Sequence, residues 1–252
     1  MTTETNLEGL VNYNGVLDEI SAELIHQSLP DIGSIPQQES PQQNESQQMS
    51  VSEYLVAFTT QSHSYCVGCV DMVNSTKISA RLSQKRLTDY YETFLNSMAK
   101  IVGRYDGKVI KNIGDCLLYY FPLSKDGRDT EGLVKSLECG TTMIKAQPMI
   151  SQKLISNGLP GLSYRVSADY GNVMIMNANN SKEIDMIGSP VNMCSKINHT
   201  AKSNEFVIGG DFHEIVKKIH DYQFKEVHEY DIGFKSGYPV YKVESKQYSH
   251  EA

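Results

Sequence analysis

Two short apolar runs joined by a tight turn constrain the fold of this chain more than any other feature. The runs are KVIKNI at residues 108–113 and CLLYYF at residues 116–121, and only Gly114 and Asp115 separate them. A two-residue connection that contains glycine and aspartate is typical of a β-hairpin, because the turn requires positive φ angles. The pattern therefore predicts an antiparallel hairpin in the middle of the chain.

The segments beside this hairpin alternate between short apolar runs and longer stretches of helical periodicity. Residues 65–72 (YCVGCVDM) are apolar at both strand parities and predict a buried strand. A helix is expected from residues 74–76 to about residue 105, since apolar residues recur there at helical spacing. A second helix is expected from about residue 130 to 155, broken or kinked near Pro148.

The C-terminal half adds further strands and helices. Two apolar runs, at residues 162–168 and 172–178, are expected to pivot on Gly171 as a second hairpin. The remaining candidates are helices at 191–201 and 211–220 and strands at 206–209, 222–229 and 239–243. The order β-α-β-β-α-β predicts an α+β fold with a ferredoxin-like βαββαβ core and additional C-terminal strands and helices.

The chain is expected to contain one domain with appendages. Residues 1–28 are predicted to be a short helical segment, because residues 15–27 place apolar side chains at helical spacing. Residues 29–50 are rich in Gln, Ser and Pro and predict a flexible linker. The domain itself is assigned to residues 51–246 and a tail to 247–252. Whether an unknown regulator binds the N-terminal segment, or whether it dimerises, is open.

Composition excludes several classes of protein. The apolar fraction of 40% and charged fraction of 21% are those of an ordinary globular domain. The formal net charge is −7 and the basic residues are scattered, so nucleic acid is not an expected partner. No apolar run approaches the roughly 18 residues that span a bilayer, and no export signal is visible. We therefore expect no membrane association and a cytoplasmic location.

Two short motifs have structural interpretations that we favour over functional ones. Cys66 and Cys69 form a CxxC, but their odd spacing on a strand points them to opposite faces. Buried core thiols are preferred there to a metal or redox role, and the odd total of five cysteines favours reduced thiols.

The GGDF at residues 209–212 is similar to a diguanylate cyclase signature but lacks its glutamate, and Asp211 is interpreted as a helix N-cap.

Two carboxylates are predicted to meet at one rim of the sheet. In a ferredoxin-like core the first and third strands are antiparallel neighbours; Asp71 closes the first, and Asp115 precedes the third. A pair of this kind supplies the hard oxygen ligands that Mg²⁺ or Mn²⁺ prefers when it bridges phosphates. The alternative is that Asp115 only makes the turn and Asp71 only caps the following helix.

Five motifs in order resemble the class III adenylate and guanylate cyclase catalytic domain. They are YCVGCVDMVNST, GKVIKNIGDCLLYYF, YRVSADYGNVMIM, EIDMIGSPVNMCSKI and FKSGYPVY, which together extend over roughly residues 65–243. The resemblance implies a class III nucleotidyl cyclase fold. It also implies an adenylate cyclase, a phosphorus-oxygen lyase that converts ATP to cyclic AMP and pyrophosphate with two divalent cations, Mg²⁺ or Mn²⁺.

The resemblance assigns metal and phosphate roles by position. Asp71 and Asp115 match the metal-binding aspartates, and the backbone carbonyl of Met72 matches a further metal ligand. The turn whose N–H groups hold the triphosphate corresponds to Asn74, Ser75 and Thr76, and Lys235 matches a lysine that contacts the terminal phosphates. A helix N-terminus suits this use because its N–H groups favour anions.

The resemblance also assigns the base and ribose contacts. Lys111 matches a donor to a purine ring nitrogen, and Asp185 matches the acceptor for the exocyclic amine, a combination that favours ATP over GTP. Asn192 matches the residue that orients the ribose, and Lys196 matches an arginine that stabilises the transition state. Because one chain carries both the metal ligands and the base contacts, the resemblance implies a homodimer with two equivalent sites.

Several positions depart from the family pattern. Lys196 keeps the charge of the usual arginine but lacks its planar fork, which predicts slow catalysis. Asn74 and Ser75 stand where the family has glycine and phenylalanine, although asparagine tolerates the left-handed backbone. Ser167 and Ala168 replace a glycine. The main alternative is a catalytically weak or silent module that binds nucleotide or a partner in signalling; a guanylate cyclase is less favoured.

Overall fold

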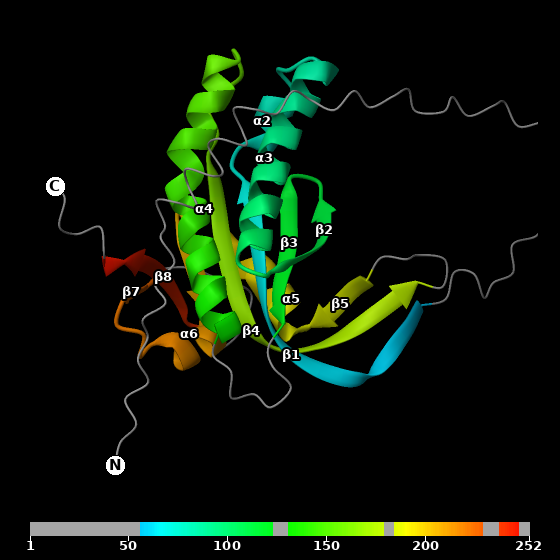
Figure 1. Cartoon of the computed structure of the whole chain (residues 1–252), viewed down its shortest axis with the longest axis vertical. Coiled ribbons are helices and arrows are strands. Elements are labelled where there is room, and N and C mark those ends of the chain that lie inside the picture. Colours follow the sequence, from blue (N-terminus) through cyan, green and yellow to red (C-terminus); the bar gives the residue numbers. More distant parts are fainter. Residues whose placement is uncertain (1–55, 123–130, 179–183, 229–236, 247–252) are drawn as a thin grey trace, which may run out of the picture.

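The computed structural model describes residues 56–122, 131–178, 184–228 and 237–246 (Figure 1). The predicted N-terminal helical segment, the linker, the C-terminal tail and Lys235 lie outside these residues.

In the described part of the chain, eight strands form one sheet in the order β2-β3-β1-β4-β6-β8-β7, and β5 pairs with β4 outside this path. The core strands are β1 (Val56–Met72), β2 (Lys108–Ile113), β3 (Cys116–Pro122) and β4 (Tyr164–Ala178). The others are β5 (Ile184–Gly188), β6 (Phe206–Gly209), β7 (Tyr222–Glu226) and β8 (Val240–Ser245). β1 lies between β3 and β4 and is antiparallel to both.

Helices cover both faces of this sheet. α3 (Gln84–Arg104) and α4 (Glu131–Ser156) lie side by side on one face (Figure 1), and α5 (Ser189–Asn198) packs on the other. Two short helices, α2 (Ser75–Ser79) and α6 (Gly210–Val216), follow β1 and β6. In the sequence, α3 connects β1 to β2 and α4 connects β3 to β4, which is the β-α-β-β-α-β order. The predicted α+β class and ferredoxin-like core are therefore confirmed.

The alternation of side chains along β1 builds two apolar cores. Cys66 and Val70 pack with the buried face of α3 and α4, whereas Val67 and Cys69 pack with Cys194 of α5. The two cysteines of the CxxC therefore face opposite sides of the sheet, as predicted, and both are buried free thiols. Burial raises the pKa of the Cys66 thiol.

The predicted helix from residues 74–76 to 105 is wrong near its start. The chain forms α2, leaves the helix at residues 80–83 and begins α3 at Gln84. Ser83 has an extended backbone (φ −66°, ψ 158°) as the N-cap of α3. This interruption separates the turn after β1 from the long helix, which apolar periodicity alone does not reveal.

The second hairpin expected at Gly171 is also wrong, because β4 is continuous through this residue. Both halves of β4 pair with β1, and Tyr65 lies opposite Gly171. β1 and β4 extend together past the other core strands, and β5 pairs with this extension (Figure 1). The prediction missed the N-terminal half of β1 and the whole of β5. Without these pairing partners, the two halves of β4 were expected to pair with each other.

Helix boundaries shift in the C-terminal half. α5 begins at Ser189, two residues before the predicted start, and α6 ends at Val216, four residues before the predicted end. The N-cap of α6 is Gly209 rather than Asp211, which lies in the first turn. A Cβ atom at Gly209 would lie 2.4 Å from Oδ1 of Asp169, so close packing explains this glycine of the GGDF motif.

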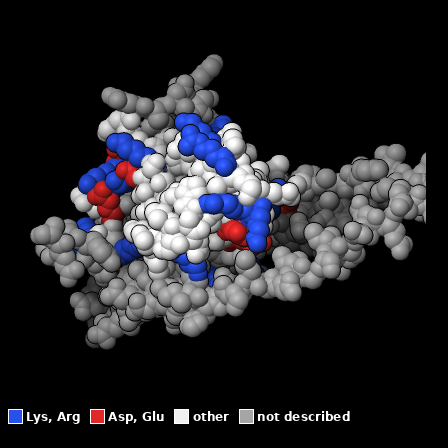
Figure 2. Space-filling model, turned by 90° about the horizontal axis from the view of Figure 1, so that it is seen from above, with Lys and Arg blue, Asp and Glu red and all other residues white. Residues whose placement is uncertain are grey.

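Charge on the surface is distributed in patches. On the face shown in Figure 2, Lys and Arg side chains form separate groups, and the visible Asp and Glu side chains lie beside some of these groups. None of the helices in the described residues combines the length and the apolar character needed to cross a bilayer.

Candidate active site

The two predicted metal-binding carboxylates lie at the same rim of the sheet. Asp71 is near the end of β1, where it pairs with Cys116 of β3 on one side and Arg165 of β4 on the other. Asp115 directly precedes Cys116 in the turn of the β2-β3 hairpin. Burial raises the pKa of the Asp71 carboxyl, and the negative charge of Asp115 raises it further. The fold therefore brings the two acids within electrostatic reach of each other.

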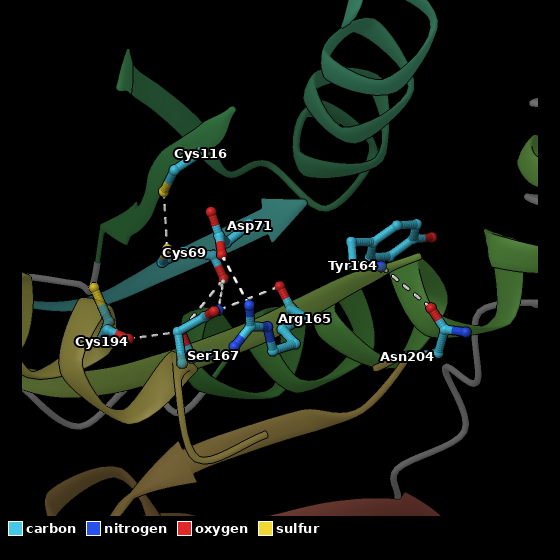
Figure 3. A network of polar contacts seen from close by, with 9 residues as sticks. Cys69, Asp71, Cys116, Tyr164, Arg165, Ser167, Cys194 and Asn204 are labelled. Atoms are coloured by element: carbon cyan, nitrogen blue, oxygen red, sulfur yellow. Dashed lines mark hydrogen bonds and ion pairs between the residues drawn. The ribbon is translucent and has the colours of Figure 1, made fainter. Parts of the chain in front are cut away.

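Arg165 places a positively charged side chain at this rim. Its Nη2 lies 3.6 Å from Oδ2 of Asp71, and its charge opposes the rise in the pKa of Asp71 (Figure 3). Its buried Nε has no hydrogen-bond partner in the described residues. The sequence pattern did not single out Arg165, because its position beside Asp71 depends on the register between β1 and β4.

A pocket of about 530 Å³ lies between β2, β3, β5 and α5. Lys111, Asp185, Asn192 and Lys196 all line it, so one pocket brings together the residues assigned to the base, the ribose and the transition state. The rest of its lining consists of Ile113, Leu118, Met186, Ser189, Val191, Met193 and Ser195. Asn192 and Lys196 are one turn apart on α5, which places both on one side of that helix.

Lys111 and Asp185 form a direct ion pair across the pocket. Nζ of Lys111 donates to Oδ2 of Asp185, and the backbone N–H of Met186 donates to Oδ1 of Asp185 at 2.8 Å. Burial alone would raise the pKa of Asp185, but the hydrogen bonds from Lys111 and Met186 outweigh it and lower the pKa. The pocket thus presents a cationic donor beside an anionic acceptor.

The turn after β1 adopts the backbone that the resemblance requires. Asn74 has φ 62° and ψ 24°, in the left-handed region, and serves as the N-cap of α2. Asparagine therefore adopts at this position the left-handed backbone that it was expected to tolerate, while the role of the turn in holding the triphosphate stays a prediction. The pocket lining contains none of the described residues that were assigned to the metal and the triphosphate. The rim and the pocket are therefore separate places on one chain.

Comparison with known proteins decides the family. The pattern of the adenylate and guanylate cyclase catalytic domain matches residues 59–248. The chain belongs to this cyclase family. It therefore contains a class III nucleotidyl cyclase domain, and the predicted fold and family are confirmed.

Related cyclases differ in the nucleotide that their names specify. The adenylyl cyclase CyaB from P. aeruginosa superimposes with a TM-score of 0.67 at 23% identity, over 73% of this chain and 95% of that one. The guanylate cyclase domain of RhGC from Catenaria anguillulae, solved with GTP, gives a TM-score of 0.64 at 16% identity over 74% and 99% of the two chains. A cytidylate cyclase from Staphylococcus aureus is 22% identical over 176 residues. That match covers 66% of this chain and 41% of the relative's length.

The rim of the cyclase domain fits a hard divalent cation. Class III cyclases generally depend on divalent metal ions, and the repulsion between Asp71 and Asp115 is of the kind that such an ion relieves. Within the described residues, no three His, Cys, Asp or Glu side chains are grouped to hold an ion. The two carboxylates therefore need further oxygen ligands, which suits an ion shared with nucleotide phosphates and not a closed structural site.

Proposed function

We propose that this cyclase domain converts ATP to cyclic AMP and pyrophosphate. The observation that carries the proposal is the Lys111–Asp185 pair in the pocket that Asn192 and Lys196 also line. Adenine presents a ring nitrogen that accepts a hydrogen bond beside an amine that donates one, and the pair matches both groups. Guanine presents the opposite polarity, so its binding would leave buried polar groups unpaired.

A cytidylate cyclase is the second candidate. Cytosine also presents a ring acceptor beside an exocyclic amine, so the Lys111–Asp185 pair matches its polarity as well. The likeness to the cytidylate cyclase from Staphylococcus aureus favours testing this base. We favour ATP because the resemblance assigns this pair to a purine, and only the product distinguishes the two bases.

The residues of the rim and pocket divide the chemistry between them. Bound Mg²⁺ or Mn²⁺ ions would lower the pKa of the ribose 3′-hydroxyl and neutralise charge on the phosphates. Asp71, Asp115 and the Met72 carbonyl would hold these ions, and Asn192 would orient the ribose for in-line attack on the α-phosphate. Lys196 stabilises the negative charge that develops on the transferred phosphoryl group.

Further groups bind the triphosphate. The turn formed by Asn74, Ser75 and Thr76 directs N–H groups at the start of α2 towards it, and Lys235 contacts its terminal phosphates. Arg165 adds a positive charge beside Asp71. Lys196 replaces the planar fork of arginine with a point charge. Outright loss of such a donor slows catalysis on the order of 10²- to 10³-fold, so we expect a smaller deficit here.

The site is proposed to form between two copies of the chain. The pocket of one subunit would face the carboxylate rim of its partner, because neither Asp71 nor Asp115 lines the pocket of its own chain. Exposed apolar side chains support a covering partner, since Ile113 in the pocket lining is 54% exposed and Ile187, which follows the lining residue Met186 on β5, is 42% exposed. The dimer would contain two equivalent sites.

The test is an assay of product identity. We expect the purified chain with Mn²⁺ and ATP to form cyclic AMP, detected by mass spectrometry, and to form less product from CTP and least from GTP. Asp71→Ala removes a proposed metal ligand and should abolish the reaction, whereas Asp221→Ala, at an exposed acid before β7, should not. Intact triphosphates after long incubation with the folded chain would favour a silent module and overturn the proposal.

A further inference from the structure

Two cysteine sulfurs meet beside the carboxylate rim. Sγ of Cys69 on β1 lies 2.9 Å from Sγ of Cys116 on β3 (Figure 3). The two residues are diagonal neighbours, since Cys69 pairs with Leu118 and Cys116 pairs with Asp71. The gap exceeds the length of a disulfide bond, about 2.04 Å, by only about 0.9 Å.

No other pair of cysteines in the chain is arranged in this way. All five cysteines lie in the described residues, and the remaining three are buried. Cys66 contacts the hydroxyl of Ser136 at 3.0 Å on the opposite face of the sheet, and Cys194 donates to the carbonyl of Val191 at 3.2 Å. Cys139 is on the buried side of α4 and packs in the core.

The two sulfurs differ in their access to solvent. Cys116 is partly exposed, whereas Cys69 is 2% exposed. An oxidant from solution therefore reaches Cys116 first, and Cys69 is held at the distance where it can resolve the oxidised sulfur. An accessible cysteine next to a resolving cysteine is the usual arrangement of a redox-sensitive pair.

We propose that hydroperoxides convert Cys69 and Cys116 into a reversible disulfide that inactivates the cyclase site. In the first step the Cys116 thiol takes one oxygen from the peroxide, giving a sulfenic acid and releasing an alcohol, or water when hydrogen peroxide is used. In the second step Sγ of Cys69 attacks that sulfur, and the departing hydroxyl leaves as water with the thiol proton. A dithiol reductant restores both thiols and is itself oxidised to a disulfide.

Inactivation follows from the position of the pair and rests on the proposed function. Cys116 directly follows Asp115, and Cys69 is two residues before Asp71. Closing the gap between the sulfurs moves the ends of β1 and β3 that carry both carboxylates. A displacement of about 1 Å can slow catalysis on the order of 10²-fold. We therefore expect the oxidised enzyme to lose on the order of 10- to 10²-fold in cyclase activity.

The experiment separates bond formation from activity. The full chain is reduced, treated with hydrogen peroxide, and analysed by differential alkylation and peptide mapping, with the cyclase assay run in parallel. We expect a Cys69–Cys116 cross-link, loss of activity, and recovery of activity with dithiothreitol. Cys116→Ser should remove the cross-link and the inhibition that it causes. Cys69→Ala provides a second test if Cys116→Ser does not fold. The control is Cys66→Ala, on the same strand but the opposite face, which should behave as the native chain.

Each outcome decides one part of the proposal. Separate alkylation of both thiols after peroxide, or a cross-link to Cys194, would overturn the disulfide. A mapped Cys69–Cys116 disulfide with unchanged activity would overturn the inhibition only. If the reduced chain forms no cyclic nucleotide, the proposed function fails, while peptide mapping still tests the disulfide.

Discussion

At the scale of single residues, Asp169 is an acid buried in the fold. It is 1% exposed on β4, and the hydroxyl of Tyr238 donates to both of its carboxylate oxygens, at 3.1 and 2.9 Å. Burial raises the pKa of this carboxyl to about 6 even though hydrogen bonds from Tyr170 and Tyr238 lower it. Near neutral pH the ionised carboxylate is therefore less stable in the folded chain than in the unfolded chain.

This raised pKa predicts a pH dependence of stability with a defined sign. The folded-state pKa of about 6 lies above the ordinary value of 3.8, so the protonated carboxyl stabilises the fold below pH 3.8 and this stability is lost as pH rises through 6. Relative to Asp169→Asn, the native chain should lose ~3 kcal/mol of unfolding free energy between about pH 4 and 7. Urea unfolding at a series of pH values measures this difference.

A second variant tests the cause. Tyr238→Phe removes a hydrogen bond that lowers the pKa of Asp169, so the loss of stability should still begin near pH 4 but extend to higher pH and become larger. A stability difference between the native chain and Asp169→Asn that stays constant with pH would contradict the assignment.

Residue-scale predictions succeeded where the chemistry is local. The left-handed backbone of Asn74 was predictable because it depends only on the tolerance of asparagine for positive φ. Arg165 and Asp169 were not identified, because their surroundings depend on which strands pair with β4 and in what register. The functional roles of the predicted site residues stay predictions, although Lys111, Asp185, Asn192 and Lys196 line one pocket.

At the scale of elements, α5 is fixed to the sheet by a small polar network. Nδ2 of Asn198 donates to the carbonyl of Arg165 at 3.2 Å and to the hydroxyl of Ser167 at 3.1 Å. That hydroxyl donates to the carbonyl of Cys194 at 2.7 Å. Ser167 thus links β4 to the helix that carries Asn192 and Lys196.

Truncation of this network should affect both stability and catalysis. Asn198→Ala removes the two hydrogen bonds that Nδ2 donates to the carbonyl of Arg165 and the hydroxyl of Ser167, which we expect to lower the unfolding free energy by about 1–3 kcal/mol. It should also lower kcat/KM, because α5 is no longer held in place. Thermal unfolding and the cyclase assay check both effects, with Asn157→Ala, at the exposed end of α4, as the control. Equal behaviour of the two variants would show that the network does not position α5.

Prediction of the elements was limited by long-range pairing. The β2-β3 hairpin was predictable because its turn is encoded within a few residues, and Gly114 has the required positive φ of 62°. The length of β4 was not, since its second half is held by β1 and β5 and not by any local turn. Apolar periodicity predicted where helices lie but not the break between α2 and α3.

At the scale of the whole molecule, the carboxylate rim and the pocket occupy two separate places on one sheet. The carboxylate rim lies where β1 meets β3, and the pocket lies between β2, β5 and α5. We proposed that each is half of a site, because the rim has two carboxylates that repel each other and the pocket lining includes the exposed side chain of Ile113. In the proposed two-fold dimer, each rim would lie against the partner's pocket, so that both sites would be completed at once.

Complementation between inactive variants tests this arrangement. Asp71→Ala removes a metal ligand and Asp185→Ala removes a base contact, so each homodimer should be inactive. In a mixed dimer, the intact rim of the Asp185→Ala chain faces the intact pocket of the Asp71→Ala chain, which restores one of two sites. Half of the dimers in a random mixture are mixed, so activity should recover to roughly a quarter of the native value.

Asp71→Ala mixed with Asp115→Ala is the matched control and should stay inactive, because neither chain offers a complete rim. A cyclase that completes its site within one chain would show no recovery in either mixture.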